Sequence, residues 1–122
     1  MMYGVERHLF ILRLGLAVTF VWIGFMIWQN PETWGGYIKP WAADLIPVPL
    51  EQAMKSTAVL DVVIGLMFLA RPLVWLGGIL GTLHLIIVLI TSGITDITVR
   101  DIGLLSATLF LTLSYLLKNK SN

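Results

Sequence analysis

The sequence has 122 residues, of which 57% are hydrophobic and 12% are charged, and its formal net charge is +1. Soluble domains are about 45–50% apolar, so this excess favours a chain whose apolar surface is covered by a lipid bilayer. So small a net charge gives no reason to expect nucleic acid as a partner. The lack of cysteine excludes disulfides, thiolate catalysis and cysteine-ligated metals.

The first apolar run extends from Leu9 to Trp28 and predicts a membrane-spanning helix. A helix of about 20 residues crosses a hydrocarbon core of roughly 30 Å. The run is too long for the apolar part of a signal peptide, so we expect it to be retained. Arg13 lies about one turn inside this span, and we expect its guanidinium to extend back to the nearer membrane surface.

The segment 30–52 is the longest predicted loop and contains four of the five prolines. Pro40 is a favourable first residue for a short helix through Leu45. Tyr37, Trp41 and Leu45 recur at a spacing of four, so their side chains share one apolar face and this helix is expected to lie flat at the membrane surface. Two interpretations stay open: the segment anchors and covers the outer end of the protein, or it is a lid over a binding site.

Three further apolar stretches predict spans over residues 53–70, 73–92 and 101–117. Pro49 is expected at the first position of the second long helix, and Arg71-Pro72 ends that helix. The sequence therefore predicts one all-α domain. We expect an antiparallel bundle of four transmembrane helices, with the short interfacial helix between the first and the second.

With four spans, both termini lie on one side of the membrane, and the basic residues are divided unevenly. The side of the termini carries Arg7, Arg13, Arg71, Lys118 and Lys120. The opposite side carries Lys39, Lys55 and Arg100 together with Glu32, Asp44, Glu51, Asp96 and Asp101. The positive-inside rule therefore predicts that both termini lie in the cytoplasm.

Two ionisable side chains lie inside otherwise apolar spans. Asp61 and His84 are each about eight residues from the outer end of their span. At a rise of 1.5 Å per residue, both lie roughly 12 Å below the outer surface, so they can form a pair. Arg100 is a second candidate partner for Asp61. With Thr57, one turn from Asp61, these residues form a candidate ligand pocket.

The Asp61 and His84 side chains admit two interpretations. They are buried polar groups with a structural role, or they belong to a pocket that binds a lipid head group, a quinone ring or a proton, as ionisable groups in membranes often do. Two histidines and no cysteine make a metal site a poor fit. A haem bound by two histidines would need His84 from two copies, because His8 lies at the opposite end of the membrane.

Small residues recur along the predicted helices. Gly77-x-x-x-Gly81 lies on the same face as His84, and such a motif lets another helix approach closely. The other candidate packing positions are Gly65 in the second span and Gly103 and Ala107 in the fourth. We expect these positions to pack helices within the chain, or against a partner membrane protein or a second copy.

Three short motifs occur in a fixed order along the chain. Arg13 and Gly24 lie in the first span, an acidic residue precedes a glycine and a basic turn in residues 61–71, and residues 100–107 open the fourth span with Arg-Asp. In these features the chain resembles the DoxX-like family of small four-helix membrane proteins. The resemblance implies a place in the cytoplasmic membrane of a bacterium or archaeon. Related proteins include a subunit of thiosulfate:quinone oxidoreductase, partners of oxidative-stress enzymes and chaperone-like membrane proteins in animals.

The resulting hypothesis is an accessory subunit of a quinone-linked membrane redox system, at most one part of an oxidoreductase. Its ligand would be a quinone or a lipid bound near Asp61 and His84. The alternative is a non-catalytic assembly or chaperone-like protein that packs against other membrane helices through Gly77 and Gly81. A small transporter is a third option, for which one polar pair makes a sparse pathway unless the protein oligomerises.

Overall fold

The computed structural model describes residues 2–121, with side chains described over residues 5–117. Its elements are α1 (Met2–Gln29), α2 (Pro31–Gly35), α3 (Pro40–Ala43), α4 (Leu50–Met67), the 3-10 helix η1 (Arg71–Leu73), α5 (Val74–Ser92) and α6 (Val99–Ser121). No strand occurs among these residues. The prediction of an all-α chain is confirmed.

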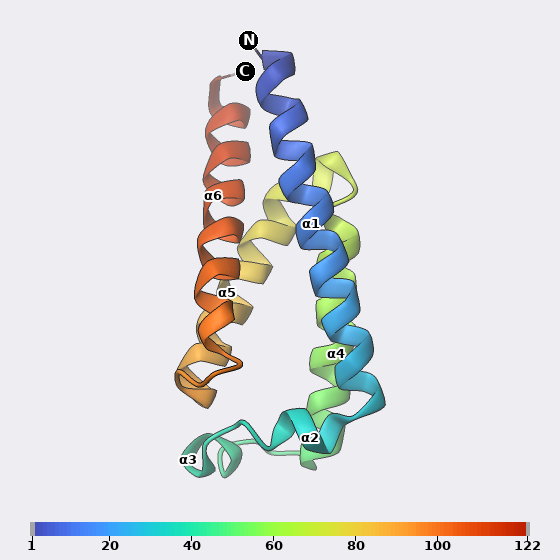
Figure 1. Ribbon diagram of the computed structural model, residues 1–122, viewed down its shortest axis with the longest axis vertical. Coiled ribbons are helices and arrows are strands. Elements are labelled where there is room, and N and C mark those ends of the chain that lie inside the picture. Colours follow the sequence, from blue (N-terminus) through green and yellow to red (C-terminus); the bar gives the residue numbers. More distant parts are fainter. Residues whose placement is uncertain (1, 122) are drawn as a thin grey trace.

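The four long helices alternate in direction and associate as two pairs (Figure 1). α1 packs along α4, and α5 packs along α6. Both termini lie at one end of the molecule, named the inner end below, and α2 and α3 lie at the other, the outer end. The two pairs meet at the inner end and separate toward the outer end. The two pairs are therefore not packed together over the full length of the antiparallel bundle that the sequence predicts.

Three helical stretches are long and apolar enough to cross a membrane: Val5–Gln29, Arg71–Ser92 and Val99–Leu117. They direct large apolar side chains outward, and Trp22 of α1 is 67% exposed. A surface of this kind indicates a membrane protein in contact with lipid. α4 is not among these stretches because its 18 residues include Glu51, Lys55 and Asp61.

Several helix boundaries differ from the predicted ones. α1 begins at Met2, well before the apolar run, and α3 ends at Ala43, before the predicted Leu45. α4 begins at Leu50 with Pro49 as its N-cap, so Pro49 does not take the predicted first helical position. α4 also ends at Met67, three residues before the predicted end at Ala70. This early end coincides with a contact from α1.

Arg13 of α1 binds the backbone just beyond the end of α4. Its Nε donates a hydrogen bond to the carbonyl oxygen of Phe68 at 2.8 Å, and Nη2 donates to the carbonyl oxygen of Leu69 at 3.1 Å. Carbonyls at a helix C-terminus lack intrahelical partners, and a cation there is favourable. Arg13 is only 6% exposed. The prediction that its guanidinium extends to the membrane surface is therefore wrong.

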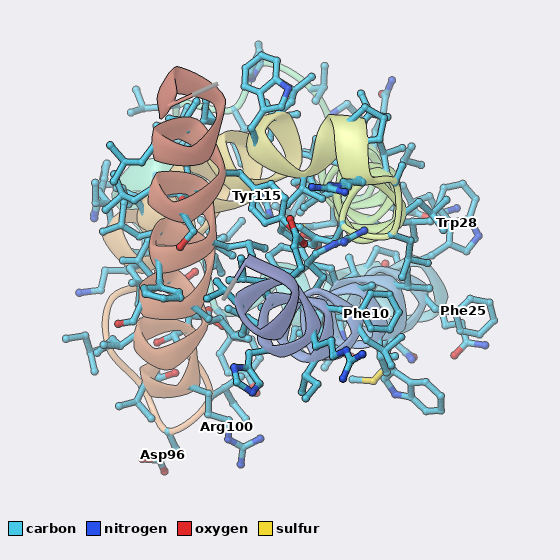
Figure 2. All side chains as sticks on the ribbon, turned by 90° about the horizontal axis from the view of Figure 1, so that it is seen from above. Phe10, Phe25, Trp28, Asp96, Arg100 and Tyr115 are labelled. Carbon is cyan, nitrogen blue, oxygen red and sulfur yellow. The ribbon has the colours of Figure 1, made fainter. Side chains whose placement is uncertain are left out.

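A polar network around Tyr115 joins the helices at the inner end. Arg13 Nη1 donates to the Tyr115 hydroxyl at 3.5 Å, and that hydroxyl donates to Glu6 Oε2 at 3.2 Å. Arg71 Nη2 donates to Glu6 Oε1 at 2.9 Å. Viewed from the inner end in Figure 2, Tyr115 lies between α6 and the other helices. The network thus connects α1, η1 and α6 and holds the two helix pairs together.

Glycines allow the closest helix contacts. A Cβ added to Gly65 of α4 would lie 2.9 Å from the carbonyl oxygen of Ala17, and one added to Gly24 of α1 would lie 2.7 Å from that of Ala58. Real Cβ atoms do not approach oxygen so closely, so α1 and α4 pack backbone against backbone at both points. This reciprocal contact explains how the α1–α4 pair stays together over its length.

The remaining predicted packing positions divide into internal and external ones. Gly77 and Gly81 are both buried, Gly77 near Met67 and Gly81 near Phe20. Their face of α5 therefore packs against helices of the same chain. Ala107 packs against the central hydrophobic core. Gly103 is exposed, and an added Cβ would meet nothing within 4 Å, so Gly103 packs against no described helix of the same chain.

We expect Arg13→Leu to lower the free energy of unfolding by about 2–4 kcal/mol, because it removes bonds from a charged donor and leaves the carbonyl oxygens of Phe68 and Leu69 without that donor. Thermal or denaturant unfolding of the protein in mild detergent, followed by circular dichroism, measures the loss. The matched control is Arg7→Leu, the same change at an exposed position of α1, which should cost no more than about 0.5 kcal/mol. Equal losses in the two variants would contradict the role assigned to Arg13.

Candidate functional site

A cavity of about 850 Å³ lies between the two helix pairs in the outer half of the molecule. Its walls come from α1, α4, α5 and α6, and residues of the segment that contains α2 and α3 line it at the outer end. Most lining side chains are apolar, including Phe20, Ile23, Ile27, Leu85 and Leu104. Small-molecule pockets typically measure roughly 300–1,000 Å³ and combine apolar walls with a few polar groups, so this cavity has the size and character of a ligand site.

Asp61 and His84 contact each other on the wall of this cavity. His84 Nε2 lies 3.0 Å from Asp61 Oδ1. The side chain of His84 is 13% exposed and that of Asp61 is 4% exposed. α4 and α5 run in opposite directions and are joined only by the short turn around η1. This connection places the two residues at the same depth, as counting residues from the outer ends predicts. The structure therefore forms the pair that the sequence allows.

The other residues of the predicted pocket also line the cavity. The Thr57 hydroxyl donates to the carbonyl oxygen of Ala53 at 3.2 Å. Arg100 is exposed at the rim, and Figure 2 shows its side chain directed outward. Among residues 5–117, basic and acidic side chains are in close contact in Glu51–Lys55, Glu6–Arg71 and Asp61–His84. Arg100, the second candidate partner for Asp61, is therefore not its partner in the structure.

Asp101 lines the same cavity, although the sequence analysis counts it only among the acidic residues of the outer side. It lies in the first turn of α6 and is half-buried. One signal could have indicated this position: Asp101, Leu104 and Thr108 share a helix face at steps of three and four, and Thr108 is fully buried. The burial of that face is visible only in the structure, where the Thr82 hydroxyl donates to Thr108 Oγ1 at 3.0 Å.

The segment 30–49, named the outer strap below, crosses the outer end of the cavity. The Lys39 backbone N–H donates to the Thr91 carbonyl oxygen near the end of α5 at 2.8 Å. Ala42 of α3 is buried and lines the cavity, whereas Trp41 and Leu45 are exposed. The strap therefore covers the site with one side and presents apolar side chains outward, as both a lid and a surface anchor require.

Neither a metal site nor a known relative indicates what this cavity does. Among the described residues, no group of three or more histidine, cysteine, aspartate or glutamate side chains is placed to hold a metal ion. No protein-family model, curated protein or solved structure matches the chain. The membership in the DoxX-like family that the sequence suggests therefore stays a proposal.

We expect single substitutions in the Asp61–His84 pair to be more damaging than the double substitution. Asp61→Leu or His84→Leu leaves one buried polar group without its partner and should cost about 3–5 kcal/mol in unfolding free energy. The double variant Asp61→Leu/His84→Leu replaces both by apolar groups and should recover at least half of the larger loss. Unfolding of all four proteins in the same detergent measures the coupling.

The matched control for this cycle is the Glu51–Lys55 pair of the same helix. These side chains are 57% and 39% exposed, so breaking this pair should cost less than about 1 kcal/mol. Strictly additive losses at Asp61 and His84 would show that the two side chains do not stabilise each other.

Proposed function

We propose that the chain is an integral membrane protein that binds an amphipathic ligand, a quinone or a lipid, in the cavity between its helix pairs. The observation that carries the proposal is the position of the buried Asp61–His84 pair on the wall of an apolar cavity. A purely structural pair would be packed closely by its neighbours, because protein interiors contain few voids larger than a water molecule. A polar pair that borders so large a space is better explained by a ligand head group.

We further propose that the protein acts as an accessory subunit of a quinone-linked redox system in the cytoplasmic membrane. The resemblance to the DoxX-like family supports this assignment, and the apolar cavity with its polar pair is compatible with a quinone ring. The chain would supply the pocket, and a partner protein would supply the electrons. The competing assembly role rested on Gly77 and Gly81 as a surface for other helices. Both glycines are buried within the chain, so the observation that favoured that role is lost.

We also propose that α4 crosses the membrane, which gives four spans with both termini in the cytoplasm. α4 is packed along α1 and runs in the opposite direction. Its internal charge is paired in Asp61–His84, and Glu51 and Lys55 lie in its first turns, where they can reach the outer membrane surface. Arg7 and Arg71 lie at the inner end, as the positive-inside rule requires. Lys118 and Lys120 also enter that count but lie outside the residues with described side chains.

Single-cysteine labelling tests this topology directly, because the natural chain has no cysteine. A membrane-impermeant thiol reagent added to intact cells should label Asp44→Cys and Asp96→Cys, at the outer end. It should label Arg7→Cys and Leu73→Cys only after the membrane is opened. All four positions are exposed in the structure. If Asp44 and Leu73 are labelled from the same side, α4 does not cross.

The ligand itself is tested by filling the cavity. Gly103 lines it, and open space surrounds this residue, so Gly103→Leu should occupy the site without disturbing packing. We expect native mass spectrometry of the gently purified protein to detect a bound quinone or lipid, and Gly103→Leu to reduce its occupancy at least about tenfold. Gly15→Leu, which adds the same group at an exposed glycine of α1 that also has open space around it, is the control. Ligand-free natural protein, or equal occupancy in both variants, would overturn the proposal.

A further inference from the structure

The two aspartates that line the cavity offer hydrogen-bond acceptors. Asp61 and Asp101 carry carboxyl groups, which in the ionised form accept hydrogen bonds and do not donate them. His84 uses Nε2 for its contact with Asp61 Oδ1. That contact commits one oxygen of the carboxyl group to the ring and leaves the other oxygen available. Asp61 Oδ2 is thus an acceptor atom of a pair that borders the cavity.

The threonine hydroxyls on the helix walls add acceptors and few donors. Thr19 donates to the Gly15 carbonyl oxygen at 2.9 Å, Thr57 to that of Ala53 at 3.2 Å, and Thr91 to that of Ile87 at 2.8 Å. Each hydroxyl has one proton, and it is donated to a carbonyl oxygen of the same helix. Only the oxygen lone pairs are therefore left for a ligand. Lining residues that can still donate are Trp34 and Tyr37 of the strap, Ser92 at the end of α5 and Arg100 at the rim. These donors belong to the outer end of the site.

We infer that the cavity selects a neutral amphiphile whose head group donates a hydrogen bond, a phenol or a quinol, over one whose head group only accepts, such as the matching ether or quinone. This inference rests on the proposed function, because it specifies the ligand of the same cavity. A hydroxyl that donates to a carboxylate forms a short, strong hydrogen bond. The two carboxylates oppose an anionic head group, and Phe20 and Trp34 offer aromatic surface to a ring.

The test compares 4-nonylphenol with 4-nonylanisole, its methyl ether, which has the same ring and chain but no hydroxyl proton. Neither probe requires a redox partner. Binding to the purified protein in lipid nanodiscs is measured by equilibrium dialysis. We expect the phenol to bind at least about tenfold more tightly, the difference that one hydrogen bond to a charged acceptor supports.

Variants of the two aspartates test whether these acceptors cause the preference for the phenol. Asp61→Asn should bring the phenol-to-ether affinity ratio close to one. Asp101→Asn, at a half-buried position that is easier to substitute, should reduce the ratio and provides the answer if Asp61→Asn does not fold. Glu51→Gln makes the same chemical change outside the cavity and should leave the ratio unchanged. Equal binding of the two probes to the natural protein would overturn this inference but not the proposed function, whereas binding of neither probe would overturn both.

Discussion

The hydrogen bonds from Arg13 to the carbonyl oxygens of Phe68 and Leu69 are the contact on which the rest of the structure depends. A buried guanidinium needs acceptors in a region without water, and the unpaired carbonyls beyond a helix C-terminus supply them. Because the contact lies where α4 ends, it coincides with the turn through η1 into α5. The same side chain reaches Tyr115 of α6, so one residue of α1 ties both helix pairs together at the inner end. The pairs diverge from that junction, and the cavity lies in the space that the divergence opens.

The cost of burying polar atoms also explains which chemical groups the cavity presents. In an apolar setting each donor is used first by the nearest acceptor of the chain, since an unmade hydrogen bond is expensive there. The wall threonines accordingly bond to carbonyl oxygens of their own helices, and the imidazole of His84 contacts Asp61. Away from the outer end of the cavity, what is left for a ligand is the surplus of acceptors. The preference inferred for a donating head group is therefore a consequence of how the protein satisfies its own polar groups.

The two ends of the molecule differ in structure: the inner end is closed and the outer end is hollow. The inner end is closed by the network of Arg13, Tyr115, Glu6 and Arg71, below which the central core is packed with apolar side chains. The outer end holds the cavity and its strap, where apolar packing is interrupted by Asp61 and His84. A rigid closed end and a hollow covered end suit a protein that holds a membrane-soluble molecule. They suit helix–helix assembly less well, because the glycine face expected to receive a partner helix is occupied by helices of the same chain.

The sequence by itself determined what depends on local geometry. Helix positions follow from the apolar runs and from the prolines that end or begin helices. The common depth of Asp61 and His84 follows from the constant rise per residue of a helix. All four candidate pocket residues line one cavity. Only the tertiary structure decided the partners of Arg13, because they are backbone carbonyls, which any residue type would supply. It also decided the contact of Tyr115 with Glu6 across 109 positions of the chain. The rotation of α6 places Asp101 on the cavity wall and leaves Gly103 without a neighbouring helix in contact. That rotation depends on how α5 and α6 fit together, with Thr82 bonded to Thr108, and periodicity within one helix cannot show which face a neighbour will cover.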